Sequence, residues 1–209
     1  AIEEERINRK KHYSGYPIES IKECLRIAEK KELEITDIAF NTKPSSNLFF
    51  KGTFFMKNFS FKKNSLLKRF KNKINIKKLL LEEFTLNNNV KFHYIEHHLA
   101  HIASAFYPSG FKDAVGLSID GSGDFVTLAI SKCKNNKIKI IEKTNFPNSL
   151  GIFYHAMTQF LGFKNYGDEY KVMGLAAYGK PKYFDKIKNN LFIQNKKSIF
   201  ELNLDYFNH

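Results

Sequence analysis

The first feature of this sequence that could do chemistry is a pair of histidines four residues apart. His97 and His101 lie in a segment, residues 96–106, whose composition is typical of a helix. Residues four apart on a helix share one face, so the two imidazoles can chelate one ion. Neutral imidazoles suit zinc, iron or manganese, and a third ligand is needed to complete a site that stays open to substrate. The same spacing also occurs in structural histidine clusters that hold no metal, and the pair alone does not exclude that alternative.

A carboxylate followed by glycines offers a third ligand nineteen residues after the second histidine. Asp120 follows residues 115–119, which are typical of a buried strand, and precedes Gly121, Ser122 and Gly123. Asp120 can ligate a metal, while the glycines let backbone N–H groups approach a phosphate without obstruction by side chains. The alternative is an ordinary hairpin turn, for which Asp-Gly is a common signal. The upstream histidine pair favours the interpretation as a ligand and phosphate-binding segment.

A third segment changes from polar to apolar character at a lysine. Residues 167–170 are mostly polar and residues 172–176 are mostly apolar, with Lys171 between them. Lys171 can neutralise a phosphate, or it can be a solvated lysine beside two carboxylates, and the sequence favours neither. The other histidines along these segments are interpreted as structural or surface residues: His93, His98, His155 and His209.

The elements around these residues predict a mixed α/β domain in which helices flank an antiparallel meander. Apolar residues recur at helical spacing over residues 18–28, behind a proline suited to a first helical turn, and over residues 151–161, which end at Gly162. Residues 37–41 are a candidate strand. The expected meander has three strands, residues 115–119, 125–131 and 137–142, joined by turn-forming Gly, Asn and Asp residues.

The net charge of +13 is concentrated in one stretch of the chain. Residues 51–80 hold ten Lys or Arg and no acidic residue, which accounts for +10 of the +13. Residues 48–82 mix Phe pairs with Lys runs, a pattern that fits either a basic amphipathic helix touching a membrane or an insertion helix packed on its own domain. We favour the insertion helix. We also favour a compositional bias over nucleic-acid binding, so that no nucleic-acid partner is expected.

Composition and cysteine content are those of an ordinary globular protein. Hydrophobic residues make up 43% and charged residues 26% of the chain, close to typical soluble domains. Cys24 and Cys133 are far apart and form no CxxC motif, which favours neither a disulfide framework nor a thiolate metal site. No apolar run approaches the roughly 18 residues of a membrane span. We therefore expect a cytoplasmic protein, and because the sequence opens on Ala1, we expect its numbering to start inside a longer protein.

Several motifs follow one another in a fixed order along the chain. They are residues 3–6 (EEER), 9–12 (RKKH), 17–25 (PIESIKECL), 97–107 (HHLAHIASAFY), 120–123 (DGSG), 146–151 (FPNSLG) and 170–179 (YKVMGLAAYG). In this order they resemble the NodU/CmcH family of O-carbamoyltransferases, and the likeness covers residues 1 to about 28 and 92 to about 185. The resemblance implies an actin-like ATPase (ASKHA, Kae1-like) fold, present here in part and carrying a variable basic insertion at about residues 45–90.

The resemblance also implies a metal site and a reaction. In the family, the histidines of the HxxxH motif and the aspartate of the DGxG motif hold a divalent metal, expected to be iron, and these positions correspond to His97, His101 and Asp120. A histidine of the RxKH motif helps to hold the carbamoyl group, which corresponds to His12. A YrdC-like domain makes carbamoyl-adenylate from carbamoyl phosphate and ATP, and the actin-like domain passes the carbamoyl group to a hydroxyl of a sugar or another small molecule.

Residues 1–209 match only part of that family's architecture. The YrdC-like domain and the second half of the actin-like domain have no counterpart in them, so we expect these residues to be inactive alone. Alternatives are another ASKHA enzyme, such as a tRNA threonylcarbamoyltransferase or a sugar kinase, and a basic nucleic-acid-binding or membrane-binding protein. The EEER and YKVMGLA motifs favour carbamoyl transfer to a small molecule.

Overall fold

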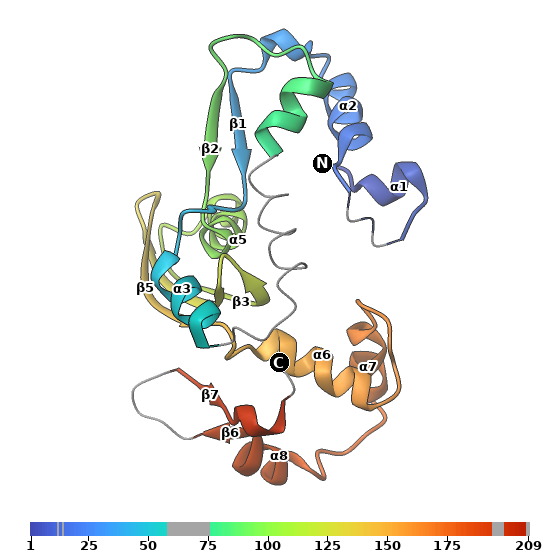
Figure 1. Cartoon of the computed structure of the whole chain (residues 1–209), viewed down its shortest axis with the longest axis vertical. Coiled ribbons are helices and arrows are strands. Elements are labelled where there is room, and N and C mark those ends of the chain that lie inside the picture. Colours follow the sequence, from blue (N-terminus) through green and yellow to red (C-terminus); the bar gives the residue numbers. More distant parts are fainter. Residues whose placement is uncertain (12, 14, 58–75, 194–198, 208–209) are drawn as a thin grey trace. The chain divides into compact units, whose positions relative to one another are not determined.

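The computed structural model describes residues 1–11, 13, 15–57, 76–193 and 199–207. Its architecture is mixed α/β, as the sequence predicts, and it divides into two compact units (Figure 1). The first unit comprises Ala1–Phe40 and Phe59–Tyr94, and the second comprises Asn41–Asn58 and Ile95–His209. His12 and most of the basic stretch, residues 58–75, lie outside the described residues.

The first unit combines short helices with a two-stranded parallel sheet. Strand β1 (Asp37–Phe40) pairs with β2 (Lys91–Tyr94), and the ring of Phe40 lies near those of Phe92 and Tyr94. The helix expected at residues 18–28 is confirmed as α2, and a carboxylate oxygen of Glu4 accepts a hydrogen bond from the backbone N–H of Ser20 in its first turn. In the part of this unit that the structure describes, the helical elements are α1 (Glu4–Asn8), α2 (Ile18–Ile27), a 3-10 turn (Glu32–Glu34) and a helix over residues 76–83.

The second unit is built on the expected antiparallel meander. Strands β3 (Asp113–Gly123), β4 (Val126–Lys134) and β5 (Lys137–Asn145) pair in the order β3-β4-β5. Two residues with positive φ form each tight connection, Asp124 (52°) and Phe125 (70°) in the first, and Asn135 (48°) and Asn136 (60°) in the second. Paired positive φ angles match the right-handed twist of the flanking strands. The alternative of a hairpin turn at Asp120 and Gly121 is wrong, because both residues still lie in β3.

Helix α5 (His97–Phe106) packs against β3 and β4 and forms the core of the second unit with them. Ile102 is 3% exposed and packs with Phe106, Val126, Ala129 and Cys133. A Cβ at Gly116 would lie 2.6 Å from Ile102 Cγ2, so the absence of a side chain there lets the helix approach the sheet. The expected helix at residues 151–161 is confirmed as α6 (Leu150–Phe160), which packs on β3 and is followed by Gly162 at φ 95°.

The expectation that residues 115–119 form a buried strand is wrong for one face of β3. Val115, Leu117 and Ile119 are 77%, 59% and 49% exposed. Side chains alternate across a strand, and the other face, with Gly116 and Ser118, is the one that α5 covers. The apolar run at residues 115–119 is typical of a strand that is buried on both faces. In the described residues, α5 covers one face of β3 and the other face is exposed.

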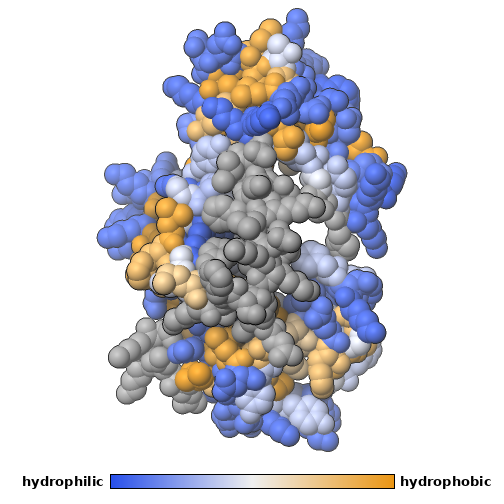
Figure 2. All heavy atoms as spheres, in the orientation of Figure 1, coloured by the Kyte–Doolittle hydropathy of each residue, from blue (hydrophilic) through white to orange (hydrophobic). Residues whose placement is uncertain are grey.

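The helix at the start of the basic insertion packs on its own unit. In α3 (Leu48–Lys57), the ring of Phe54 lies edge-on to those of Phe125 and Phe146, at 5.5 and 5.1 Å between centroids. Lys51 is buried and donates a hydrogen bond from Nζ to the carbonyl of Pro44. The outer apolar residues of α3 are exposed, and Figure 2 shows hydrophobic surface where Figure 1 places this helix. For residues 48–57, the structure agrees with the insertion helix that the sequence favours.

The second unit is completed by shorter elements that follow α5 and α6 along the chain. They are a 3-10 turn (Tyr107–Ser109), α7 (Glu169–Ala176), α8 (Phe184–Leu191), β6 (Phe192–Ile193), β7 (Glu201–Leu202) and a 3-10 turn (Leu204–Tyr206). Among the residues that the structure describes, none forms a helix long and apolar enough to span a membrane.

Replacing Ile102 by Ala is expected to lower the free energy of unfolding by about 2–5 kcal/mol, because it leaves a cavity under α5. Urea unfolding followed by circular dichroism measures the loss. The matched control is Val115→Ala on the exposed face of β3, where we expect a change within about 0.5 kcal/mol. If both substitutions lowered the free energy of unfolding equally, Ile102 would not belong to the core between α5 and the sheet.

Candidate metal centre

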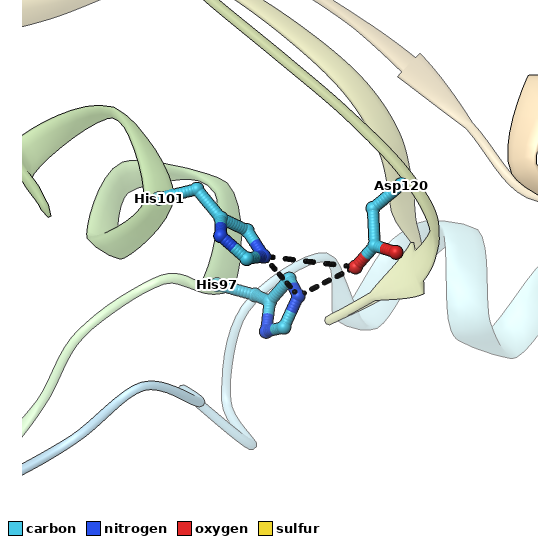
Figure 3. Close-up of side chains that lie close together, drawn as sticks. All are labelled: His97, His101 and Asp120. Carbon is cyan, nitrogen blue, oxygen red and sulfur yellow. Dashed lines mark hydrogen bonds and ion pairs between the residues drawn. The ribbon is translucent and has the colours of Figure 1, made fainter. Parts of the chain in front are cut away.

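Three side chains from two elements converge at one end of the meander (Figure 3). His97 and His101 come from the first turns of α5, and Asp120 comes from the end of β3. The Nε2 atom of His97 lies 2.8 Å from Oδ2 of Asp120 and 3.0 Å from Nε2 of His101. Oδ2 of Asp120 lies 3.7 Å from His101 Nε2. The structure therefore brings together the three residues that the sequence and the resemblance select as metal ligands.

The donor set of this cluster fits a divalent metal ion. A carboxylate oxygen accepts hydrogen bonds, and the facing Nε2 atom of a neutral imidazole protonated at Nδ1 carries a lone pair. Three such atoms in close contact need a proton or a cation between them. Two ligand atoms that are each about 2.1 Å from one ion lie roughly 3 Å apart when they subtend a right angle. The separations of 2.8 and 3.0 Å around His97 are close to that value.

The environment of Asp120 favours its ionised form. Partial burial raises the pKa of this carboxyl, but the hydrogen bond from the backbone N–H of Gly121 lowers it. When a proton on His97 Nε2 takes the place of a metal ion, the hydrogen bond from His97 and the charges of His97 and His101 also lower it, so that the pKa lies below its usual value. Asp120 is thus a carboxylate at neutral pH, and a carboxylate beside two imidazoles is a ligand set suited to zinc, iron or manganese.

Helix α5 is fixed to the sheet by the histidine that lies between the two candidate ligands. His98 is buried, and its Nε2 must donate to the carbonyl of Val126, because a carbonyl only accepts. Its Nδ1 then accepts from the hydroxyl of Ser118, at 2.8 Å. Burial lowers the pKa of His98, which keeps this imidazole neutral. The interpretation of His98 as structural agrees with these contacts, which set the height of His97 and His101 above the sheet.

The first turn of α6 holds the backbone of Asp120. The hydroxyl of Ser149, which is 0% exposed, faces the carbonyl oxygens of Asp120 at 3.1 Å and Gly121 at 2.6 Å. A Cβ at Gly151 would lie 2.5 Å from the backbone nitrogen of Gly121 and 2.7 Å from the carbonyl carbon of Asp120. Only a glycine allows this approach. Sequence reasoning assigned no role to Ser149 or Gly151, although both belong to the motif at residues 146–151.

The glycines after Asp120 have structural roles in addition to the phosphate contact predicted from the sequence. The backbone N–H of Gly121 donates to Oδ1 of Asp120, at 2.6 Å. The imidazole of His97 lies against Gly123, where any Cβ would collide with the ring. Ser122 is exposed. Phosphate binding by Gly121, Ser122 and Gly123 stays a prediction.

Lys171 lies on α7 and has a carboxylate partner. Its Nζ is 2.6 Å from Oδ1 of Asp168, and this contact raises the pKa of Lys171 and lowers that of Asp168. A phosphate bound by Lys171 would have to share the ammonium with Asp168. The phosphate-binding role of Lys171 therefore stays a prediction, as does the role of His12, which is outside the described residues.

These observations define a mixed α/β protein with a candidate metal centre, and comparison with known proteins gives its family. The family model for the carbamoyltransferase N-terminus matches residues 1–209, so the chain belongs to the carbamoyltransferase family. The resemblance inferred from the ordered motifs is confirmed. The members of this family are enzymes of the transferase class.

The curated proteins that this chain is similar to include an uncharacterized protein and two nodulation proteins. An uncharacterized protein of Synechocystis is 35% identical over 219 residues, covering 100% of this chain and 36% of its own length. The nodulation protein NolNO of Sinorhizobium fredii is 34% identical over 87% of this chain and 26% of its own length. NolO of Bradyrhizobium diazoefficiens is 40% identical over 44% of this chain and 17% of its own length. The chain thus spans about a third or less of these relatives.

Replacing Gly151 by Ala is expected to weaken zinc binding by at least tenfold, because the new methyl group pushes against the Asp120 backbone and displaces its carboxylate. Competition titration with a chelating zinc indicator measures the dissociation constant. Gly174→Ala is the matched control, since a Cβ there meets nothing within 4 Å, and it should bind zinc as the unchanged chain does. Equal affinity of the two variants would show that α6 does not hold Asp120 in a binding position.

Proposed function

We propose that this chain forms the metal-binding part of an O-carbamoyltransferase. The complete enzyme transfers a carbamoyl group from carbamoyl-adenylate, made from carbamoyl phosphate and ATP, to a hydroxyl of a sugar or another small molecule. The observation that carries the proposal is the convergence of His97, His101 and Asp120 in a chain of the carbamoyltransferase family. An actin-like fold for the complete domain belongs to the same proposal and is compatible with the mixed α/β architecture.

The proposed cofactor is one divalent metal ion, expected to be iron, held by His97 Nε2, His101 Nε2 and a carboxylate oxygen of Asp120. An ion bound there supplies positive charge that stabilises negative charge on phosphate oxygens of the adenylate. Three protein ligands leave room for oxygen atoms of a substrate, as in metal sites that take part in catalysis.

The chain's own residues would bind and orient the donor at this centre. Asp120 is ionised and fixed at both its backbone and its carboxylate, so its position does not depend on substrate. Ser122 is exposed beside it and offers a hydroxyl to a phosphate oxygen. The ammonium of Lys171 would pair with the same phosphate while it keeps its contact with Asp168. Each of these contacts keeps the adenylate in one orientation relative to the acceptor hydroxyl.

The remaining steps are proposed to need parts of the enzyme outside residues 1–209. Curated relatives are about three or more times as long as the stretch that this chain matches. We place formation of carbamoyl-adenylate in a YrdC-like domain of the complete protein, and we expect residues 1–209 to be inactive without it. The hydroxylated acceptor would reach the donor at the metal centre.

His97 and His101 together are expected to determine metal binding. The purified chain should carry near one iron or zinc per molecule, measured by elemental analysis, and the double substitution His97→Ala and His101→Ala should lose it. His93→Ala is the control, because this exposed histidine pairs with Asp37 in the first unit. Equal metal content in all three proteins would place the metal elsewhere, and an absence of metal from the unchanged chain after reconstitution would refute the centre.

His12 is proposed to orient the carbamoyl group or to accept the proton of the acceptor hydroxyl, since a neutral imidazole is suited to general-base work near pH 7. Replacing His12 by Ala in the full-length enzyme should lower the rate of carbamoyl transfer by roughly 10²–10⁴-fold. Metal content should stay unchanged, which separates this role from that of the centre. Transfer at the unchanged rate would remove His12 from the mechanism.

A further inference from the structure

A buried carboxylate outside the proposed ligand set lies directly behind His97. Asp124 is 6% exposed and occupies the first turn position between β3 and β4, with φ 52°. A buried carboxylate is costly unless hydrogen bonds compensate for its lost hydration. Asp124 accepts such bonds from Thr42 Oγ1 at 2.8 Å, from the backbone N–H of Lys43 at 2.8 Å and from the backbone N–H of His97 at 3.1 Å.

The bond to His97 fixes the start of α5. The first backbone N–H groups of a helix have no partner within the helix, and a carboxylate that accepts from one of them is favoured by the helix dipole. Asp124 takes this role for α5 from the neighbouring hairpin rather than from the residue before the helix. This bond holds the backbone of His97, the first candidate ligand, against the β3–β4 turn.

The other bonds of Asp124 fix the loop that contacts the imidazole of His97. The carboxylate holds Thr42 and Lys43, and its backbone carbonyl accepts from Asn47 Nδ2 at 2.9 Å. The preceding residue in that loop, Asn41, has its carbonyl oxygen 3.3 Å from Nδ1 of His97. A carbonyl only accepts, so this contact requires a proton on Nδ1 and leaves Nε2 to face Asp120.

We propose that Asp124 is a positioning residue of the metal centre, which holds both the backbone of His97 and the loop carbonyl that orients its imidazole. The proposal deepens the proposed function and rests on it. Histidine ligands are oriented by a hydrogen bond to their second nitrogen, and the loss of such outer contacts costs 10–100-fold in metal affinity. Here one carboxylate organises two contacts of the same histidine, while Gly123 leaves space for the ring.

Four variants of the whole chain test this role. Asp124→Ala removes both side-chain acceptors and leaves the backbone carbonyl that accepts from Asn47. Asp124→Asn keeps one oxygen for the N–H groups of Lys43 and His97, and its amide can donate to Thr42 Oγ1. The controls remove a carboxylate and a hydroxyl elsewhere in the second unit: Asp113→Ala breaks an exposed ion pair with Lys134, and Thr53→Val breaks a hydrogen bond within α3.

Cobalt(II) alone is the probe, and its visible absorption on titration gives affinity and ligand geometry. Asp124→Ala is expected to weaken cobalt binding at least tenfold and to change the shape of the absorption band, with unchanged far-ultraviolet circular dichroism. Asp124→Asn should stay within about threefold of the unchanged chain, as should both controls. Cobalt affinity and spectrum that are the same in Asp124→Ala as in the unchanged chain would overturn the proposal.

A measurement without metal separates this inference from the proposed function. In the chelator-treated protein, ¹⁵N–¹H correlation spectra of the imidazoles should show the His97 signals displaced in Asp124→Ala and restored in Asp124→Asn, with those of His155 on α6 unchanged. This result in a chain that binds no cobalt would refute the metal centre while supporting the positioning role. Undisplaced His97 signals would refute the positioning role whether or not cobalt binds. If Asp124→Ala does not fold, Thr42→Val, which removes one donor to the carboxylate, takes its place with the same criteria.

Discussion

The geometry of the candidate centre depends on the packing of α5 across the β3–β4 hairpin. Ile102 fills the core at a point where Gly116 has no side chain, and His98 bonds to Ser118 and to the carbonyl of Val126. These contacts fix both the distance and the rotation of the helix. Since residues four apart share a face, the rotation that buries His98 and Ile102 presents His97 and His101 to the end of β3. One packing arrangement therefore positions two of the three candidate ligands.

The third candidate ligand is positioned by a different part of the second unit. The N-terminus of α6 holds the backbone of Asp120 through Ser149, the residue before the helix, and through Gly151 in its first turn. The β3–β4 turn places Asp124 at the start of α5. A side chain at Gly151 would displace the backbone of Asp120 and Gly121, and a side chain at Gly123 would displace the imidazole of His97. Helices and strands support functional side chains more precisely than loops do, and the loss of a contact that orients a metal ligand typically costs 10–100-fold in metal affinity. The motif at residues 146–151 has a physical explanation in this arrangement.

Much of this arrangement could be predicted from the sequence because it rests on local periodicity. The spacing of His97 and His101, the three strands of the meander, and the glycine that ends α6 all depend on neighbours along the chain. The hairpin position was not predictable, since Asp120-Gly121 carries a stronger turn signal than Asp124-Phe125, and tertiary contacts place the turn at the second pair. The exposed face of β3 and the contacts of Ser149 are likewise set by residues far apart in sequence.

His97, His101 and Asp120 are proposed to hold one divalent ion. Anomalous diffraction from crystals of the chain grown with iron(II) or zinc tests this proposal most directly, with data collected on both sides of the metal absorption edge. We expect one strong anomalous peak, within bonding distance of Nε2 of both histidines and of a carboxylate oxygen of Asp120. A metal bound elsewhere, with these three side chains bonded only to one another, would contradict the proposal.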